Sequence, residues 1–336
     1  MKRPIIILLF SLLLLRNASA ENPEQTFKIM SYNVENLFDT KDDSLTVDED
    51  FTPTGNHYWT YSKYKKKIAD IAKTIIALGE WEVPALVGLC EIENETVLWD
   101  LVRRSPLENA HYSFVHKDSP DARGVDVALL YQKDKFELLW AEFLSMQFKT
   151  RDILYAAGLV PTDDTLHVFV CHFPSRLGGE LESEDRRVQV ATTLRQKVDS
   201  IYNNVTRKPR IVIMGDFNDM PDNRSVAGTL NAQKPVAPFS EAELYNLAYP
   251  LYDKGLGTYK LAGEWNLLDQ IIVSGALLNA ESNFHTREMH IYSPDFLRET
   301  DETKGGFKPF RTFLGQRYLG GVSDHFPVYV DFIMKK

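Results

Sequence analysis

The chain has only two cysteines among its 336 residues, too few for a disulfide framework. Cys90 and Cys171 each lie in an apolar run, which favours two buried free thiols over a bridge. Positive charge is also scarce, because the chain has 38 lysines and arginines but 47 acidic residues, for a net charge of −9. Such a chain has no global attraction for polyanions, so a phosphate-rich ligand must be held by a local basic patch or by a metal ion.

Long apolar runs are missing from the sequence after its first twenty residues. Within these, Lys2 and Arg3 precede the apolar run 5–15, and Ala18-Ser19-Ala20 supplies small residues at the spacing of a signal-peptidase site. The run is about half the length that spans a bilayer, which disfavours a stable membrane anchor. We therefore predict a signal peptide over residues 1–20 and export to the periplasm or the extracellular space. Cleavage after Ala20 removes three cations, for a mature net charge of −9 − 3 = −12.

Residues 21–336 contain no internal repeat and no low-complexity linker, so we predict one domain and expect a monomer. Helical periodicity marks residues 62–78, which Gly79 follows as a stop, and residues 180–202. Strand-length apolar runs recur at 27–34, 85–92, 125–131, 166–172, 211–215, 268–274 and 326–333. Nearly continuous apolar strands are typical of sheets covered on both faces. The pattern predicts an α/β fold of two packed sheets with helices outside.

The most informative motif is Gly215-Asp216-Phe217-Asn218-Asp219, directly after the apolar run 211–214. In an extended chain, Asp216 and Asn218 point to the same side. A carboxylate there can bind a metal ion or a proton, and an amide can orient a phosphate oxygen. A simple turn rich in Asp and Asn fits the same residues.

A second motif, Ser323-Asp324-His325, precedes the last predicted strand. Asp324 offers a hard oxygen ligand, and His325 can titrate near neutral pH. Asp269 lies inside the apolar run 267–273, where a carboxylate is destabilising unless it is paired. A pair between Asp269 and His325 would fix the tautomer of the imidazole and stabilise its charged form. The alternatives are a strand-start turn and an edge-strand carboxylate that faces water.

Three further polar residues end apolar runs. Asn33 follows the run 27–30, Glu91 follows 86–89, and His172 ends 166–172 shortly before Arg176. Asn33 offers a neutral oxygen ligand or an amide donor, and His172 and Arg176 could both donate to a phosphate. Taken singly, each also fits a structural role: a cap, a solvated carboxylate, and a core histidine near a surface arginine.

Together the motifs read Asn, Glu, His, Asp-x-Asn, Asp and Asp-His, all at or near predicted strand ends. In this order the sequence resembles the endonuclease/exonuclease/phosphatase superfamily, which includes pancreatic-type deoxyribonuclease and apurinic-site endonucleases. The resemblance extends from Ser31-Tyr32-Asn33 to Ser323-Asp324-His325, and Gly-Asp-Phe-Asn and Ser-Asp-His are its most specific parts. It implies a four-layered α/β sandwich of two mixed β-sheets flanked by helices, with a metal site at one edge.

The resemblance also implies a role for each matching residue. Glu91 would be the main metal ligand, supported by Asn33 and Asp324. Asp216 and Asn218 would handle the attacking water and the scissile phosphate. The remaining matches are the Asp269–His325 pair, His172 as a phosphate donor, and Arg123 and Tyr131 as less specific positions near the site. The expected ion is Mg²⁺, with Mn²⁺ or Ca²⁺ as alternatives, and the expected reaction is in-line attack by water, with Asp216 or His325 as the base.

Three stretches, 39–60, 221–240 and 295–321, are predicted to be long surface loops. The last interleaves basic with aromatic residues, and we expect Lys308 and Arg311 to contact substrate together with Arg123 and Arg176. Residues 58–67 form a second basic and aromatic stretch. These stretches favour a nucleic-acid phosphodiester as substrate.

Other interpretations remain open at the level of the sequence. The rings could pack the loops down while the charges face water. The substrate could be a lipid head group, as for a sphingomyelinase, or a soluble phosphate ester. The fold could also serve as a non-catalytic binding protein.

Overall fold

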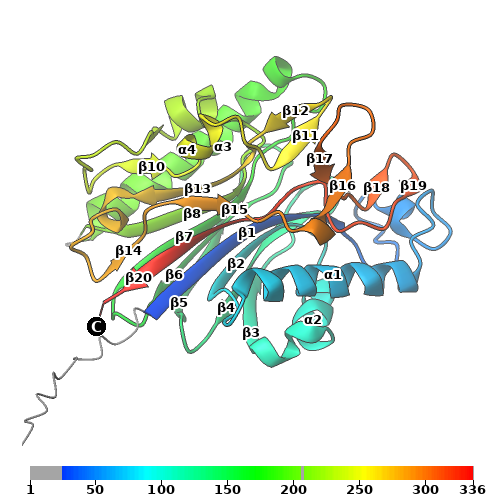
Figure 1. Cartoon of the computed structure of the whole chain (residues 1–336), viewed down its shortest axis with the longest axis horizontal. Coiled ribbons are helices and arrows are strands. Elements are labelled where there is room, and N and C mark those ends of the chain that lie inside the picture. Colours follow the sequence, from blue (N-terminus) through cyan, green and yellow to red (C-terminus); the bar gives the residue numbers. More distant parts are fainter. Residues whose placement is uncertain (1–24, 206–207, 336) are drawn as a thin grey trace, which may run out of the picture.

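The computed structural model describes residues 25–205 and 208–335 (Figure 1). The predicted signal peptide lies outside the described residues. Two seven-stranded sheets form the centre of the molecule. Among the described residues, no helix is both long enough and apolar enough to cross a membrane.

The first sheet has the order β14-β20-β1-β2-β4-β3, and β15 also pairs with β20. Strands β1 and β2 run parallel, whereas every other pair in this sheet is antiparallel. The strands are β1 (Gln25–Leu37), β2 (Leu86–Ile92), β3 (Tyr112–His116), β4 (Asp126–Gln132), β14 (Phe284–His285), β15 (Met289–Ile291) and β20 (Val328–Met334).

The second sheet has the order β5-β6-β7-β8-β13-β10-β9. Strands β7 and β8 run parallel, and β13 runs antiparallel to β8. The strands are β5 (Glu137–Leu144), β6 (Ile153–Leu159), β7 (Thr165–His172), β8 (Arg210–Asp216), β9 (Ala232–Gln233), β10 (Leu244–Asn246) and β13 (Asp269–Ser274).

Helices cover the outer face of each sheet (Figure 1). Helices α1 (Tyr61–Gly79) and α2 (Glu95–Arg103) pack on the first sheet, and α3 (Glu180–Asn204) packs on the second. The short α4 (Tyr249–Tyr252) instead contacts the apolar cluster between the sheets through Leu251 and Tyr252. A third apolar cluster fills the space between the sheets. The four layers confirm the predicted sandwich. The two predicted helices are present, whereas α2 was not predicted, because only four buried apolar residues over nine positions mark it.

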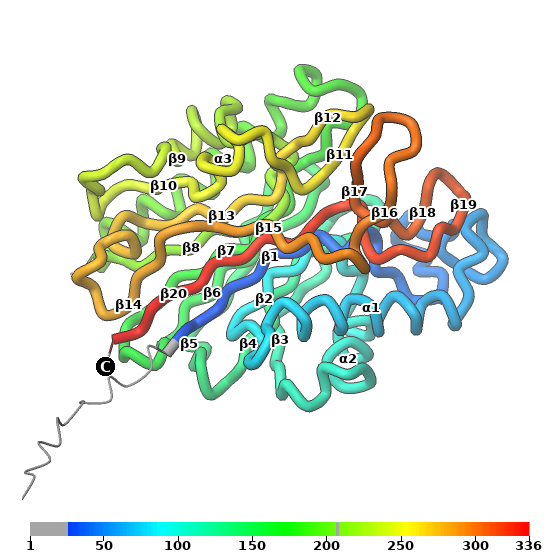
Figure 2. Tube along the Cα trace, viewed as in Figure 1, coloured from blue at the N-terminus to red at the C-terminus, as the bar shows by residue number. Residues whose placement is uncertain are grey.

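Small hairpins and short helical turns occupy parts of the predicted loops and several other connections. Residues 295–321 form two hairpins, β16 (Arg298–Thr300) with β17 (Phe307–Pro309) and β18 (Phe313–Leu314) with β19 (Arg317–Tyr318). A further hairpin joins β11 (Tyr259–Leu261) to β12 (Glu264–Asn266). The helical turns are η1 (Glu49–Phe51), η2 (Pro106–Ala110), η3 (Arg224–Thr229), η4 (Gly275–Leu277) and η5 (Asp295–Leu297). The tube in Figure 2 shows that the hairpins lie together at one end of both sheets.

Strand direction brings the polar motifs to that end. Because β1 and β2 are parallel, Asn33 and Glu91 both lie in the carboxyl-terminal parts of their strands, at the same edge of the first sheet. In the second sheet, His172 pairs in register with Asp216, and Asp216 pairs with Asp269. His325 reaches the same place because it lies just before β20, separated from it by Phe326 and Pro327, and β20 is antiparallel to β1.

Candidate active site

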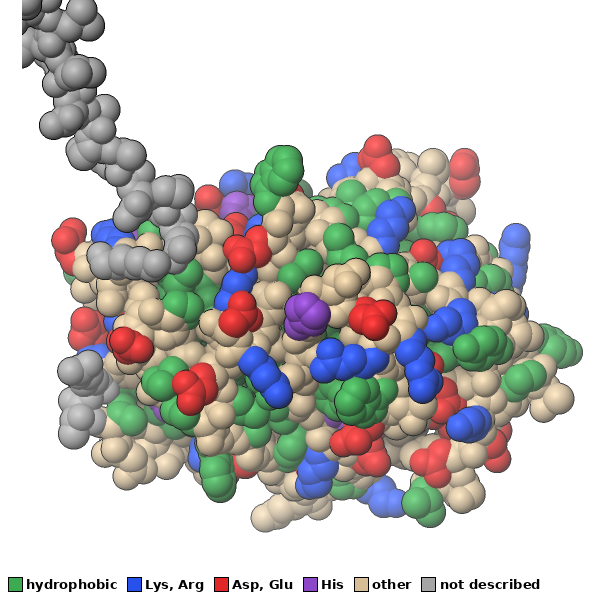
Figure 3. Space-filling view, turned by 90° about the horizontal axis from the view of Figure 1, so that it is seen from below, with side chains coloured by type: hydrophobic (Ala, Val, Ile, Leu, Met, Phe, Trp, Pro, Cys, Tyr) green, Lys and Arg blue, Asp and Glu red, His purple; other side chains and the backbone are tan. Residues whose placement is uncertain are grey.

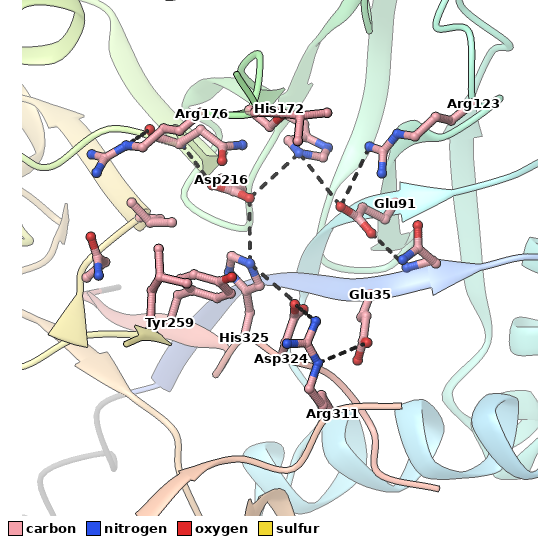
Figure 4. A pocket seen from close by; sticks show the side chains of 17 residues that line it. Glu35, Glu91, Arg123, His172, Arg176, Asp216, Tyr259, Arg311, Asp324 and His325 are labelled. Atoms are coloured by element: carbon pink, nitrogen blue, oxygen red, sulfur yellow. Dashed lines mark hydrogen bonds and ion pairs between the residues drawn. The ribbon is translucent and has the colours of Figure 1, made fainter. Parts of the chain in front are cut away.

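A cavity of about 570 Å³ opens at the edge where these strand ends meet (Figure 4). Nine of the predicted site residues line it, namely Glu91, Arg123, His172, Arg176, Asp216, Asn218, Arg311, Asp324 and His325. Asn33 and Asp269 lie directly behind the lining and hold two of these side chains. Lys308 is not among the described lining residues and instead forms an ion pair with Glu299.

Asp269 and His325 form a buried carboxylate–imidazole pair. His325 Nδ1 lies 2.7 Å from Asp269 Oδ2, and both side chains are almost fully buried. Burial alone would lower the pKa of His325, but the carboxylates of Asp269 and Asp216 raise it well above its usual value. The imidazole is therefore held in its charged form, with Nε2 directed toward the cavity, where Asp216 Oδ2 lies 3.9 Å away.

Asp216 lies at the floor of the cavity and has two fixed hydrogen bonds. Its Oδ2 accepts from Asn33 Nδ2 at 3.0 Å, and its Oδ1 accepts from the backbone N–H of Asn218 at 2.8 Å. Burial, reinforced by the nearby Asp269, raises the pKa of Asp216 to about 6, against the opposing effect of charged His325. A carboxylate with that pKa is ionised at neutral pH and basic enough to accept a proton from water.

Gly215 is required at the start of this motif. Its φ of +142° is rare for L side chains, and an added Cβ would lie 1.8 Å from the carbonyl oxygen of Cys171. The chain then leaves the strand, and Asn218 adopts φ +49°, so Asp216 and Asn218 are not both extended as the sequence reading assumed. Both nevertheless line the cavity, because Asn218 Nδ2 donates to the carbonyl of Phe173 and holds the turn in place.

His172 faces the same floor as a neutral group. Burial and the nearby cations Arg151 and Arg123 lower its pKa well below the usual value. Its Nε2 lies 3.6 Å from Asp216 Oδ2 and 4.0 Å from Glu91 Oε1. The guanidinium of Arg176, by contrast, is engaged with protein groups, since its Nε donates to the carbonyl of Asn218 at 2.7 Å.

Glu91 projects into the cavity from a strained backbone position. It has φ +66°, and its Oε2 accepts from the backbone N–H of Asn36 at 2.8 Å. Four of the ten non-glycine residues with positive φ in the described chain line this cavity, namely Glu35, Asn36, Glu91 and Asn218. Backbone strain of this kind gathers at functional sites because the fold must hold side chains in directions that a relaxed chain would not choose.

Glu35 and Tyr259 are cavity residues that the sequence reading missed. Glu35 is nearly fully buried, and burial together with the charge of Asp324 raises its pKa to about 7. Tyr259 lies against the imidazole of His325, with 4.9 Å between ring centroids. A signal for Glu35 was present, because Asn33-Val34-Glu35 repeats the alternate polar spacing of Asp216-Phe217-Asn218. Tyr259 comes from an unpredicted hairpin and had no such signal.

The donor chemistry of the cavity fits a hard divalent ion. Glu35, Glu91 and Asp324 offer carboxylate oxygens, which Mg²⁺ and similar ions prefer. Asn33 is already engaged, because its Oδ1 accepts from the backbone N–H of Glu35 and its Nδ2 donates to Asp216. It therefore acts mainly as a support for the carboxylates. The residues that would hold an ion are Glu91 first, with Asp324. Glu35 joins them because a carboxylate has about four acceptor sites, of which its hydrogen bonds from Thr312 and Phe313 use two.

A separate group, His116, Asp118 and Asp126, also brings possible ligand atoms within 4.8 Å of one another. It shares no residue with the described lining of the cavity. Hydrogen bonds within the protein already engage it, since Asp126 Oδ1 accepts from the backbone N–H of Ser119 and Nε2 of His116 lies 3.2 Å from Asp118 Oδ1. The candidate metal centre is therefore the cavity and not this group.

Asp126 gives a prediction about stability. Burial raises its pKa from 3.8 to about 7, so the folded state binds this proton more tightly than the unfolded chain. The stabilisation from the protonated form is fully present below pH 4 and is lost as the pH rises through 7. We expect Asp126→Asn, which keeps the acceptor for Ser119, to match the wild type at pH 4 and to exceed its unfolding free energy by about 1–3 kcal/mol at pH 8. Urea unfolding at both pH values measures this, and an equal difference at the two would contradict it.

Three of the rings and one of the lysines in the stretches expected to contact a polynucleotide are internal. Trp59, Tyr64 and Phe313 are buried, and Trp59 packs against Phe313 with 5.6 Å between centroids. Lys67 is buried as well and donates to backbone carbonyls. Trp59 and Phe313 are internal because residues 39–60 and 310–319 cover each other's apolar surface.

Tyr131 is also wrongly assigned, because it pairs with Leu86 at the opposite end of β2 from Glu91.

Cys90 and Cys171 are buried and free, as expected, and Cys90 Sγ lies 3.3 Å from the carbonyl oxygen of Cys171. Burial raises the pKa of both thiols. Because the thiolate is the reactive form, these cysteines are chemically inert and pack as small apolar side chains.

Comparison with known proteins agrees with this geometry. A model of the "Endonuclease/Exonuclease/phosphatase family" matches residues 28–335. No curated protein sequence matches the chain. The structure is similar to the catalytic domain of human Nocturnin with bound sulfate anion (15% identity, TM-score 0.57, 92% of this chain and 95% of that chain). It is also similar to a mannosyl-6-phosphatase of Bacteroides thetaiotaomicron (15% identity, TM-score 0.57, 92% and 100%) and to D. rerio TDP2 complexed with single strand DNA product (14% identity, TM-score 0.55, 92% and 99%). At these identities the structures show a shared fold.

Proposed function

Because the chain belongs to the endonuclease/exonuclease/phosphatase family and is a hydrolase of phosphoester bonds, we propose that it cleaves phosphodiesters, nucleic acid first, by in-line attack of water. The observation that carries this proposal is the arrangement of ionised Asp216 beside the charged His325–Asp269 pair, in one cavity with Glu91. A base, a cationic donor and a carboxylate for a metal ion are the groups that such a displacement requires.

The proton states of the two candidate bases support Asp216 as the one that acts. His325 is already charged because of Asp269, so it has no free lone pair with which to accept a proton from water. Asp216, with a pKa of about 6, accepts that proton. Charged His325 and neutral His172 then donate hydrogen bonds toward the phosphate oxygens, where negative charge develops in the transition state. Asn218, fixed by Phe173, orients the phosphate.

A divalent ion, Mg²⁺ first and Mn²⁺ or Ca²⁺ as alternatives, completes the proposal. It would be held by Glu91 with Asp324 and Glu35, and it would polarise a phosphate oxygen and stabilise charge in the transition state. The role of the protein is to keep those carboxylates in place. The hydrogen bond from Asn36 holds Glu91, and burial holds Glu35.

The charge of the cavity favours a diester over a monoester. Four carboxylates line it, Glu35, Glu91, Asp216 and Asp324, against the three guanidinium groups of Arg123, Arg176 and Arg311 and the charged imidazole of His325. The lining thus has no excess of positive charge for a phosphate dianion, whereas a diester carries a single negative charge. The cavity also extends past Leu177 and Leu261, both exposed, so organic groups on either side of the phosphorus have room.

Hydrolysis of small phosphate esters is the second candidate. It is favoured by the burial of Trp59, Tyr64 and Lys67, which removes part of the basic and aromatic surface that a polynucleotide would contact. On the face shown in Figure 3, basic side chains also lie among acidic and apolar ones. A substrate small enough to be held by the cavity itself would need none of this outer surface.

A substrate panel tests the proposal. We expect turnover of an oligonucleotide and of bis(p-nitrophenyl) phosphate to exceed that of p-nitrophenyl phosphate and mannose 6-phosphate, with Mg²⁺ present. EDTA should abolish the activity and added Mg²⁺ should restore it, because the carboxylates alone cannot stabilise a developing negative charge. Faster monoester turnover would favour the second candidate, and sphingomyelin hydrolysis would indicate a lipid substrate. Activity that persists in EDTA would contradict the metal-dependent reaction.

We also propose that the chain is exported, from the cationic start, the short apolar run and Ala18-Ser19-Ala20. Expression of the full sequence in a Gram-negative host, followed by mass spectrometry of the periplasmic fraction, tests this. The expected amino terminus is Glu21, and recovery of the full-length chain from the cytoplasm alone would contradict it.

A further inference from the structure

Arg311 spans two of the carboxylates that would hold the divalent ion. Its Nη2 lies 2.9 Å from Asp324 Oδ2, and its Nε lies 3.8 Å from Glu35 Oε1 (Figure 4). Among the described residues, this Nε is buried and has no hydrogen-bond partner. The guanidinium thus neutralises the carboxylates while its Nε donor stays unsatisfied, so a different partner could satisfy it better.

The backbone that carries Arg311 is firmly held. Glu35 Oε2 accepts from the N–H of Thr312 at 2.6 Å, and Glu35 Oε1 accepts from the N–H of Phe313 at 3.2 Å. Buried Lys67 donates to Thr312 Oγ1 at 2.6 Å and to the carbonyl oxygens of Glu35 and Val322. The segment therefore does not shift as a whole.

The side chain of Arg311 is free to move where its backbone is not. It remains about one third exposed and has four rotatable bonds, so the guanidinium can turn toward the open cavity while residues 312 and 313 stay in place.

We propose that Arg311 is an internal counter-ion, which a divalent ion must displace from Asp324 and Glu35, and that the released guanidinium then binds the substrate phosphate. This inference rests on the proposed function. A guanidinium at hydrogen-bond distance and a hard cation compete for Asp324 Oδ2, because both interactions depend on the same negative charge. Arg311 therefore weakens metal binding in the absence of substrate and strengthens phosphate binding once the ion is in place.

Calorimetric titration of Mn²⁺ into the substrate-free protein tests the displacement. We expect Arg311→Gln to bind Mn²⁺ roughly fivefold more tightly than the wild type, the effect of removing one partly exposed ion pair. The same variant should show a raised KM for bis(p-nitrophenyl) phosphate. Arg311→Lys, which keeps a cation, should bind Mn²⁺ nearly as weakly as the wild type. Lys304→Gln is the matched control, because Lys304 lies on the same segment, is exposed and is not among the described residues that line the cavity, so its replacement should leave both quantities unchanged.

Unchanged or weaker Mn²⁺ binding by Arg311→Gln, in a variant whose thermal unfolding matches the wild type, would overturn the inference. If that variant is unstable, we compare Arg311→Lys with Arg311→Met, which both keep an unbranched side chain and differ in charge. Equal Mn²⁺ affinities for these two would overturn the inference as well. Failure of the proposed function is distinguishable, since the wild type would then hydrolyse no phosphodiester whatever the order of the Mn²⁺ affinities.

Discussion

Replacing His325 with alanine, or Asp216 with asparagine, is expected to lower kcat by roughly a thousandfold or more while the fold stays intact. His325→Ala removes the cation that faces the phosphate and leaves the buried carboxylate of Asp269 without its partner. Asp216→Asn removes the proton acceptor but retains an oxygen for the backbone N–H of Asn218. Turnover of bis(p-nitrophenyl) phosphate under saturating Mg²⁺ measures both losses, and thermal unfolding checks the fold.

The double variant of the pair sharpens this first prediction. Because His325 and Asp269 act as one unit at 2.7 Å, His325→Ala combined with Asp269→Asn should lose little more activity than His325→Ala alone. His290→Ala is a suitable control, since His290 is part-exposed on β15 and does not line the described cavity. Near wild-type turnover in either single variant would refute the assignment of the catalytic groups.

Replacing Glu91 with glutamine should have the second largest effect. The amide removes the negative charge that we propose as the main metal ligand, so half-maximal activity should require about tenfold to a hundredfold more Mg²⁺. A glutamine oxygen can still accept the hydrogen bond from the N–H of Asn36, which separates loss of charge from loss of the local fold. A titration of activity against Mg²⁺ measures the shift, supported by calorimetry of Mn²⁺ binding.

Glu95→Gln provides the control for Glu91→Gln. Glu95 is an exposed carboxylate in the first turn of α2, four residues further along the chain. Its replacement should leave the Mg²⁺ requirement unchanged. A Glu91→Gln enzyme with a wild-type Mg²⁺ requirement would show that the ion is held elsewhere, for instance by His116, Asp118 and Asp126.

The polar motifs at strand ends were readable from the sequence because they interrupt apolar runs. Asp216 and Asp324-His325 stand out for this reason, and so does Asp269, whose charge within an apolar strand already required a partner. Their joint order supported the family resemblance and with it the sandwich fold. Helix α2, by contrast, could not be predicted, since four apolar residues over nine positions carry little periodic signal.

Residues that contact across long sequence separations could not be assigned in this way. Lys67 appeared to be one cation among several in a basic stretch, yet helix α1 directs it inward to carbonyl groups of residues 35 and 322. Trp59 and Phe313 appeared to be rings for stacking on bases, but each covers the other. Composition cannot distinguish a ring that packs a loop from a ring that binds a ligand, because both uses need the same side chain.

The sequence by itself indicated the general reaction of this protein, because the order of its polar motifs at strand ends carries the resemblance to a family of phosphoester hydrolases. It also determined the layers, since strand and helix periods are local properties. Only the tertiary structure decided the rest. It showed His325 charged by Asp269, Asp216 tuned by burial, Glu35 in the cavity, and Arg311 bound to the carboxylates expected to hold the ion. These properties depend on distances between residues far apart in the chain, which no local pattern encodes.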